Sequence, residues 1–202
     1  MGIPFDLLGR VFARWGHRTY PNWAWPLLAR ALEALPRGAR VLDLGGGTGV
    51  LARAALTARA DLKPVIADPA RGMLRHAPEP AEVVVARAEA LPFADAEMDA
   101  VLVGEALHHF QDPQAALVEI ARVLRPGGLL WIYEFDPHRG VGRWVYWGER
   151  LLGEPAHFFT PEALLRSLRA LGFEGDYRER RGRYVLTARL RGERRRAAAR
   201  PA

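Results

Sequence analysis

Cysteine is absent from this chain of 202 residues. Its absence excludes disulfides, thiolate metal sites, iron–sulfur clusters and cysteine nucleophiles. It also favours a cytoplasmic protein, because small exported proteins commonly rely on disulfides. Without such bonds the fold depends on its hydrophobic core, and half of the residues are hydrophobic. A chain of this length and composition is sufficient for one globular domain.

Long apolar runs are also missing. No segment approaches the roughly 20 apolar residues that span a bilayer, so we expect no transmembrane helix. The N-terminal stretch 1–15 alternates apolar and charged residues. It lacks the basic-then-apolar order of an export signal, and we expect none.

Lysine is nearly absent, with Lys63 alone among 29 basic residues. The net charge of +6 is unevenly placed, because residues 191–202 hold five arginines and one glutamate. We predict a single domain over residues 1–190 and a basic, disordered tail over 191–202. A tail that contacts nucleic acid or acidic lipid is the alternative.

Short apolar runs alternate with amphipathic stretches along the chain, which is typical of an α/β domain with a largely parallel sheet. The predicted strands occupy residues 41–44, 64–67, 82–86, 99–103, 129–135, 173–179 and 183–190. The predicted helices occupy residues 6–15, 23–35, 50–60, 71–77, 113–124 and 161–171, with a short helix within 136–148.

Turn and cap residues set several of these boundaries. Thr160 and Pro161 predict a capped helix start, and Arg181 with Gly182 predicts a hairpin turn. Residues 125–128 have the sequence Arg-Pro-Gly-Gly, which we expect to separate the preceding helix from the next strand.

The most informative segment, 41–49, leads from a strand through a glycine-rich turn into a helix. Glycines let a ligand approach backbone N–H groups at a helix N-terminus. The segment lacks the Gly-Lys-Ser/Thr of a phosphate loop. A dinucleotide fingerprint would need glycine at the position of Val50 or Ala52. A variant of that fingerprint ends in alanine, which Ala52 fits, so a nicotinamide cofactor remains a distant alternative. Asp43 would repel a pyrophosphate and attract a cationic ligand.

Asp68 ends the second predicted strand, 25 residues after Asp43. A carboxylate at that place can accept hydrogen bonds from both ribose hydroxyls. The two carboxylates together therefore predict a nucleoside ligand with a positive group and no requirement for phosphate.

The segment 41–49 resembles motif I of the class I S-adenosylmethionine-dependent methyltransferases. Residues 86–93, 99–110 and 124–128 resemble the branch that includes the ubiquinone and menaquinone biosynthesis methyltransferases. The resemblance covers about residues 35–190. It implies a Rossmann-like fold with a seven-stranded, mostly parallel sheet, one antiparallel strand and helices on both faces. It also implies S-adenosylmethionine as cofactor and S-adenosylhomocysteine as product.

The resemblance assigns cofactor roles to matching positions. It implies that Asp43 and the glycine loop hold the methionine part, that Asp68 holds the ribose, and that Pro69 and Met73 lie near the adenine. The full set of implied cofactor residues is Asp43, Gly45, Gly46, Gly47, Gly49, Asp68, Pro69, Met73, Ala88, Glu89 and Gly104.

One position departs from the family pattern. Arg87 stands where the family usually has an acid that accepts from the adenine amino group, and arginine cannot accept. Glu89 or a backbone carbonyl replaces that acceptor, or adenine is held more weakly.

Methyl transfer from a sulfonium depends mainly on placement, and a base is needed only if the acceptor must lose a proton. His108, His109 and Tyr133 are the candidate catalytic residues, with packing in a loop as the alternative for the histidines. Neither histidine has ligand partners at usual metal spacing, so we expect no metal.

Two segments are implied to cover the acceptor: N-terminal cap helices within 1–36 and an insert at 136–160. The aromatic stretch 144–147, with Trp15, Trp23 and Trp25, would suit a lid over a flat or apolar acceptor. Ordinary core packing and a membrane or partner contact are the alternatives.

The sequence therefore predicts a methyltransferase acting on a small molecule. Two other readings remain open. One alternative is a nucleic-acid methyltransferase, suggested by the basic tail and by the arginine run at 178–183. The chain lacks an Asn/Asp-Pro-Pro-Tyr-like segment, which argues against this alternative. A non-catalytic cofactor-binding regulator is the other. A homodimer is an open expectation.

Overall fold

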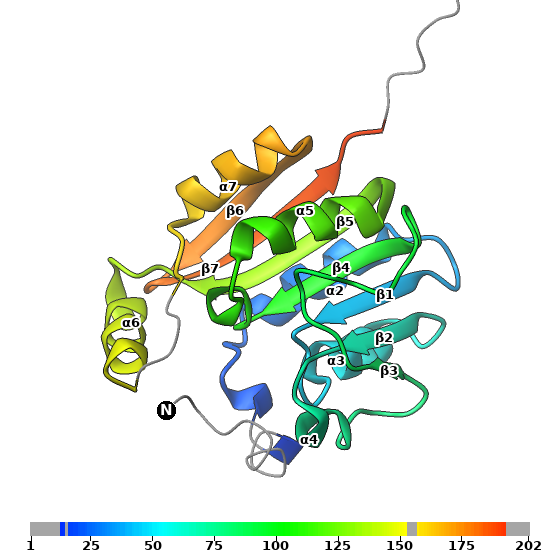
Figure 1. The fold of residues 1–202 in the computed structure, drawn as a ribbon, viewed down its shortest axis with the longest axis horizontal. Helices are drawn as coiled ribbons and strands as arrows, with labels where there is room; N and C mark the ends of the chain where they lie inside the picture. The colour runs from blue at the N-terminus through cyan, green and yellow to red at the C-terminus, as the bar shows by residue number, and fades with distance from the viewer. Residues whose placement is uncertain (1–12, 15, 153–156, 193–202) are drawn as a thin grey trace, which may run out of the picture.

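The computed structural model describes residues 13–14, 16–152 and 157–192. Seven strands form one sheet in the order β3–β2–β1–β4–β5–β7–β6 (Figure 1). Strands β1 to β5 are parallel, and β7 pairs antiparallel with β5 and β6. The predicted α/β fold with one antiparallel strand is confirmed. The strands are β1 Arg40–Leu44, β2 Lys63–Ala67, β3 Glu82–Val84, β4 Met98–Gly104, β5 Leu124–Phe135, β6 Phe173–Arg180 and β7 Arg183–Leu190.

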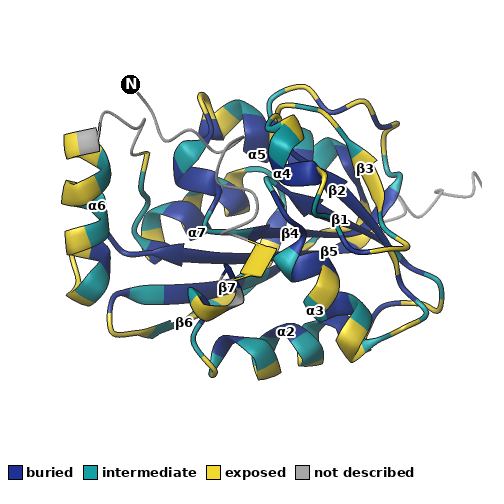
Figure 2. Cartoon of the chain, turned by 90° about the horizontal axis from the view of Figure 1, so that it is seen from below, coloured by how far each residue is buried: buried dark blue, intermediate teal, exposed yellow. Residues whose placement is uncertain are grey.

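Helices cover both faces of the sheet, as Figure 2 shows. Along β4, Val101 and Val103 pack in the core with α5 and α7, whereas Ala100 and Leu102 pack in the core with α2 and α3. This alternation follows from the two-residue period of a strand. The helical elements are η1 Gly16–Arg18, α2 Ala24–Glu33, α3 Val50–Ala58, α4 Arg71–Leu74, η2 Leu107–His109, α5 Pro113–Val123, α6 Gly140–Leu152 and α7 Pro161–Ala170.

Several boundaries differ from the predictions. Strand β5 begins at Leu124 and runs through the Arg-Pro-Gly-Gly segment, which was expected to lie outside the strand. The register shifts there: Leu124 is opposite Met98, but Leu129 is opposite Ala100. The intervening residues bulge from the ladder, so sequence breakers do not end the strand. Helix α4 and strand β3 are shorter than predicted, and α6 is longer.

Local caps and turns agree with the sequence. The Thr160 hydroxyl accepts from the Ala163 N–H and caps α7. Arg181 and Gly182 both have positive φ, 55° and 78°, between β6 and β7, which suits a tight hairpin. The predicted helix at 6–15 lies outside the described residues except for 13 and 14, and the predicted tail at 191–202 lies outside them except for 191 and 192.

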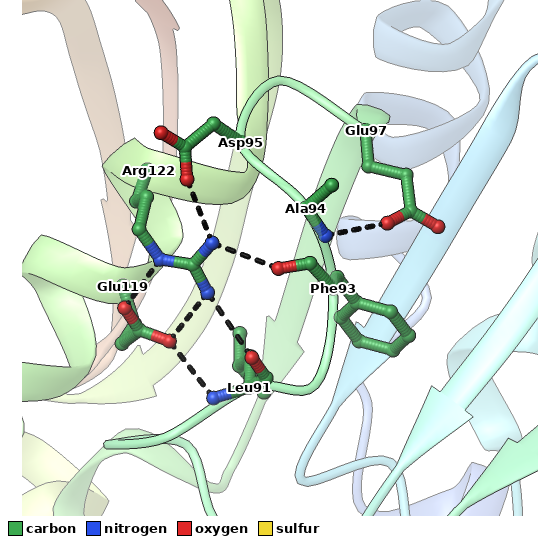
Figure 3. A network of polar contacts seen from close by, with 7 residues as sticks. All are labelled: Leu91, Phe93, Ala94, Asp95, Glu97, Glu119 and Arg122. Carbon is green, nitrogen blue, oxygen red and sulfur yellow. Dashed lines mark hydrogen bonds and ion pairs between the residues drawn. The ribbon is translucent and has the colours of Figure 1, made fainter.

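A guanidinium clamp fixes the loop between β3 and β4 to α5 (Figure 3). Arg122 donates to the carbonyl oxygens of Leu91 and Phe93 at 3.1 and 2.8 Å. It also pairs with Glu119 at 2.6 Å, and Glu119 accepts from the Leu91 N–H. The planar, multi-donor guanidinium can satisfy several acceptors at once. The loop that follows the predicted adenine segment is therefore held by side chains of α5.

Candidate active site

One cavity of about 510 Å³ opens at the carboxyl ends of the parallel strands. In an α/β sheet this edge is where ligands bind. The loops after β1, β2 and β4 line it, together with the end of β5, helix α6 and the segment before α2. The predicted site residues that line it are Asp43, Gly45, Gly46, Gly47, Asp68, Pro69, Met73, Gly104, His108 and His109.

Asp68 connects the loops that follow β1 and β2. Its Oδ2 accepts from the Gly47 N–H at 2.9 Å, and its Oδ1 accepts from the Ala70 N–H at 2.7 Å. Gly47 has φ of 53°, and a Cβ there would lie 3.0 Å from Met73 Cε. The loop therefore presents bare backbone beside a carboxylate, an arrangement suited to a ribose.

Asp43 lies beneath this loop, buried at 1% exposure. Its Oδ2 accepts from the Ala52 N–H in the first turn of α3 at 2.9 Å. Burial raises the pKa of Asp43 to about 7, aided by the charge of Asp68 and opposed by the Ala52 N–H. A cationic ligand in the cavity would favour the ionised form of this carboxyl.

Gly104 ends β4 at a point of close approach. A Cβ there would collide with the Tyr20 hydroxyl. Tyr133 stacks behind Tyr20, with ring centroids 4.9 Å apart, and its hydroxyl donates to the Thr19 carbonyl at 3.4 Å. Tyr133 is fully buried and does not line the cavity, so the structure places this predicted catalytic residue behind the wall.

His108 is buried between two carboxylates. Its Nδ1 lies 2.7 Å from Glu134 Oε2, and its Nε2 lies 3.3 Å from Glu149 Oε1. Burial lowers the pKa of His108, but the charges and hydrogen bonds of Glu134 and Glu149 outweigh burial and raise it to about 10. The two carboxylates thus favour the protonated imidazolium, whereas a general base must be neutral.

The two histidines and Glu149 also gather in space. One ligand atom from each of His108, His109 and Glu149 lies within 4.8 Å of the others, the one such trio found within the described ranges. Both ring nitrogens of His108 face carboxylate oxygens, which is also the geometry of a hydrogen-bonded imidazolium. The expectation that no metal binds stays a prediction.

The adenine side departs from the implied arrangement. Pro69, Ala70 and Met73 line the cavity, but Ala88 and Glu89 do not. Glu89 is occupied, because it pairs with Arg87 at 3.3 Å and accepts from the Asp112 N–H at 3.1 Å. Its role toward adenine stays a prediction. Gly49, also predicted for the cofactor, caps α3 with φ of 75° and lies outside the lining.

Sequence reasoning missed three charged residues of the lining: Glu105, Glu149 and Arg183. Glu105 directly follows Gly104 at a strand end, which was an available signal. Arg183 belongs to the arginine run that suggested nucleic acid, yet its guanidinium lies 5.4 Å from the Phe135 ring centroid in the cavity. Trp144 and Trp147, expected at the pocket, are exposed, and of segment 144–147 it is Val145 that lines the cavity.

Comparison with known proteins identifies the family of the chain. The methyltransferase domain family matches residues 42–132. A demethylmenaquinone methyltransferase of Thermus thermophilus is 37% identical over 206 residues, covering 86% of this chain and 89% of that protein. One of Renibacterium salmoninarum is 39% identical over 125 residues, covering 59% of this chain. The alignment spans about half of that relative's length, 51%.

A solved S-adenosylmethionine-dependent methyltransferase of Thermotoga maritima has the same fold, with a TM-score of 0.72 at 24% identity, covering 93% of this chain and 97% of that one. Fold and site thus define a class I S-adenosylmethionine-dependent methyltransferase. Within that class the chain belongs to the ubiquinone/menaquinone biosynthesis methyltransferase family, as the sequence resemblance predicted. Among the described residues, no helix is long and apolar enough to cross a membrane.

Proposed function

We propose that this protein transfers a methyl group from S-adenosylmethionine to a ring carbon of a small, flat hydroquinone that carries an apolar chain. The observation that carries the proposal is one cavity of about 510 Å³ that extends across the sheet edge. The glycine loop and Asp68 lie on its β1–β2 side. Phe135 and Arg183 lie on its β5–β7 side, where an aromatic acceptor can stack. The names of the relatives from T. thermophilus and R. salmoninarum, demethylmenaquinone methyltransferases, support this acceptor class.

The residues present fit the cofactor. Its ribose would meet Asp68, its adenine would lie against Pro69 and Met73, and its methionine part would pass the glycine loop toward Gly104. A Cβ at Gly47 or Gly104 would intrude on this space. When bound, S-adenosylmethionine supplies a methyl group activated on a sulfonium.

The chain's own residues position the acceptor. Phe135 and Arg183 line the side of the cavity on which an aromatic acceptor would lie, next to the glycine loop and Asp68 that would hold the cofactor. Placement of this kind can supply about 7–11 kcal/mol of the barrier reduction. A hydroquinone, and not the quinone, is proposed because only its electron-rich ring carbon is nucleophilic.

Calorimetric titration with S-adenosylhomocysteine tests the cofactor, with NADH as control. We expect micromolar binding of the first and none of the second. Binding of NADH instead would contradict the assignments of Asp43 and Asp68.

Mass spectrometry tests the acceptor, using a short-chain 2-isoprenyl-1,4-naphthoquinol kept reduced. We expect the gain of one methyl group on a ring carbon. Transfer to RNA under the same conditions would instead support a nucleic-acid methyltransferase. Cofactor binding without transfer to either would support a non-catalytic regulator.

A further inference from the structure

Glu105 occupies an unusual position at the end of β4. Its backbone has φ of 51°, a left-handed conformation that non-glycine residues rarely adopt. Such strain persists only where the surroundings hold it, and it concentrates at functional sites. The Glu105 N–H donates to the Tyr133 carbonyl at 2.9 Å. This bond to β5 holds the residue in place at the cavity wall.

The Glu105 carboxyl has one oxygen that remains available to a ligand, although Thr19 hydrogen-bonds to the carboxyl. Its Oε1 atom is buried and has no hydrogen-bond partner among the residues that the structure describes. A buried acceptor without a donor is costly, so it calls for a partner that arrives with a ligand. Gly104, which precedes it, is one of the implied cofactor residues and lines the cavity, so the carboxyl lies next to the predicted cofactor position.

We propose that Glu105 is the catalytic base, taking the hydroxyl proton of the acceptor. This inference rests on the proposed function, because it requires an acceptor with an acidic hydroxyl. The histidine pair was the sequence candidate for this role. Both ring nitrogens of His108 face carboxylate oxygens of Glu134 and Glu149, so neither nitrogen is free to take a proton from the acceptor.

Methyl transfer to a hydroquinone balances in protons and electrons. The hydroxyl proton moves to Glu105, and the ring carbon next to that oxygen forms a bond to the methyl group as the methyl–sulfur bond breaks toward sulfur. The same carbon then loses its hydrogen as a proton, the ring regains aromaticity, and Glu105 returns its proton to the oxygen. One proton is released for each methyl group, and nothing is oxidised or reduced.

Charged and titratable groups face Glu105 from every element around it. These are Tyr20 before α2, His108 on η2, Tyr133 and Glu134 on β5, and Arg183 on β7. Burial raises the pKa of Glu105 to about 7, with Glu134 adding to the rise, and with Thr19, His108 and Arg183 opposing it. A base with a pKa near the working pH is the most effective kind.

The test compares Glu105→Gln with the wild type on the short-chain naphthoquinol. We expect kcat at pH 7.5 to fall about 100-fold, with the affinity for S-adenosylhomocysteine within about threefold. The wild-type kcat should rise through pH 7, and the variant's profile should lose that limb. Glu174→Gln, on the exposed edge strand β6, is the matched control and should behave as wild type. Retention of kcat or of the limb in Glu105→Gln would overturn the proposal.

Urea unfolding supplies a readout that needs no acceptor. Because the folded pKa is raised, ionisation of Glu105 costs stability as pH rises through 7. We therefore expect Glu105→Gln to gain stability over wild type at pH 8 and not at pH 5. If the wild type methylates no naphthoquinol, the proposed acceptor is wrong. The unfolding measurement then tests Glu105 separately. A stability difference between Glu105→Gln and wild type that is the same at pH 5 and pH 8 would overturn the assignment of Glu105. Glu105→Gly, which relieves the strained φ, should fold at least as well and lose the same activity.

Discussion

Asp68 serves the fold and the ligand at once, because the same carboxylate accepts from two backbone N–H groups and lines the cavity. Asp68→Ala should weaken S-adenosylhomocysteine binding by about 1.5–3 kcal/mol for each charge-assisted bond lost, or roughly 10- to 100-fold. Calorimetry measures the change. Asp176→Ala on exposed β6 is the control, and equal affinities in the two variants would exclude the ribose role.

Gly47 combines a positive φ with contact to the ligand space. Gly47→Val should abolish S-adenosylhomocysteine binding, because its side chain would meet Met73 and enter the cavity, while the domain remains folded. The strained φ should cost about 1–3 kcal/mol of stability. Gly127→Val separates the two effects, since Gly127 has φ of 80° and open space around it. Gly127→Val should lose a comparable amount of stability and still bind S-adenosylhomocysteine. Binding retained in Gly47→Val would contradict the assignment of the glycine loop.

At the scale of elements, carboxylates on β5 and α6 together raise the pKa of His108 on η2. Glu134 on β5 accepts from the Leu107 N–H at 2.9 Å through Oε1 and faces His108 through Oε2. Glu149 reaches the opposite side of the same ring from α6. Three segments distant in the sequence thus create one buried cation.

Glu134→Gln should lower the pKa of His108, which NMR titration of the imidazole can follow. It should also cost about 3–5 kcal/mol of stability, as expected when one partner of a buried pair is removed. The folded pKa of His108 lies above its unfolded value, so this stabilisation is complete below about pH 6.5. The stability difference from wild type should therefore shrink as pH rises toward 10. A difference that is the same at pH 6 and pH 10 would contradict the ion-pair assignment, and Glu82→Gln, exposed on β3, is the control.

Helix α6 shows why the aromatic segment misled the sequence argument. Val145 and Glu149 are four residues apart and line the cavity, whereas Trp144, Trp147 and Leu151 are exposed on another side of the helix. A helical period of 3.6 residues separates these two sets. Of the segment 144–147 that was expected to form a lid, Val145 lines the cavity, and Glu149 reaches the cavity from the next turn of the helix.

At the scale of the whole molecule, stability should decline from mildly acidic to mildly basic pH. The pKa values of Asp43 and Glu105 are raised to about 7, and that of His108 is raised to about 10. Each raised pKa means that the folded state binds more protons than the unfolded one, so stability falls as pH rises.

We expect the free energy of unfolding to be lower at pH 8.5 than at pH 5.5 by several kcal/mol, since a tenfold change in a group's proton affinity on folding corresponds to about 1.4 kcal/mol and three groups contribute. Urea unfolding at both pH values measures it. A free energy that is constant or rises across this interval would show that these three groups are not perturbed as the structure indicates.

Domain boundaries, the homodimer and the cytoplasmic location stay predictions.

The sequence by itself determined the alternation of strands and helices, the capped start of α7, the hairpin at Arg181 and the glycine loop between β1 and α3. These features depend on neighbours within a few residues, so local patterns contain them. Only the tertiary structure decided that Glu105 takes a strained conformation in the cavity and that His108 is a cation. Those properties depend on burial and on pairing across 26 residues or more, and burial and long-range pairing exist only once the chain has packed.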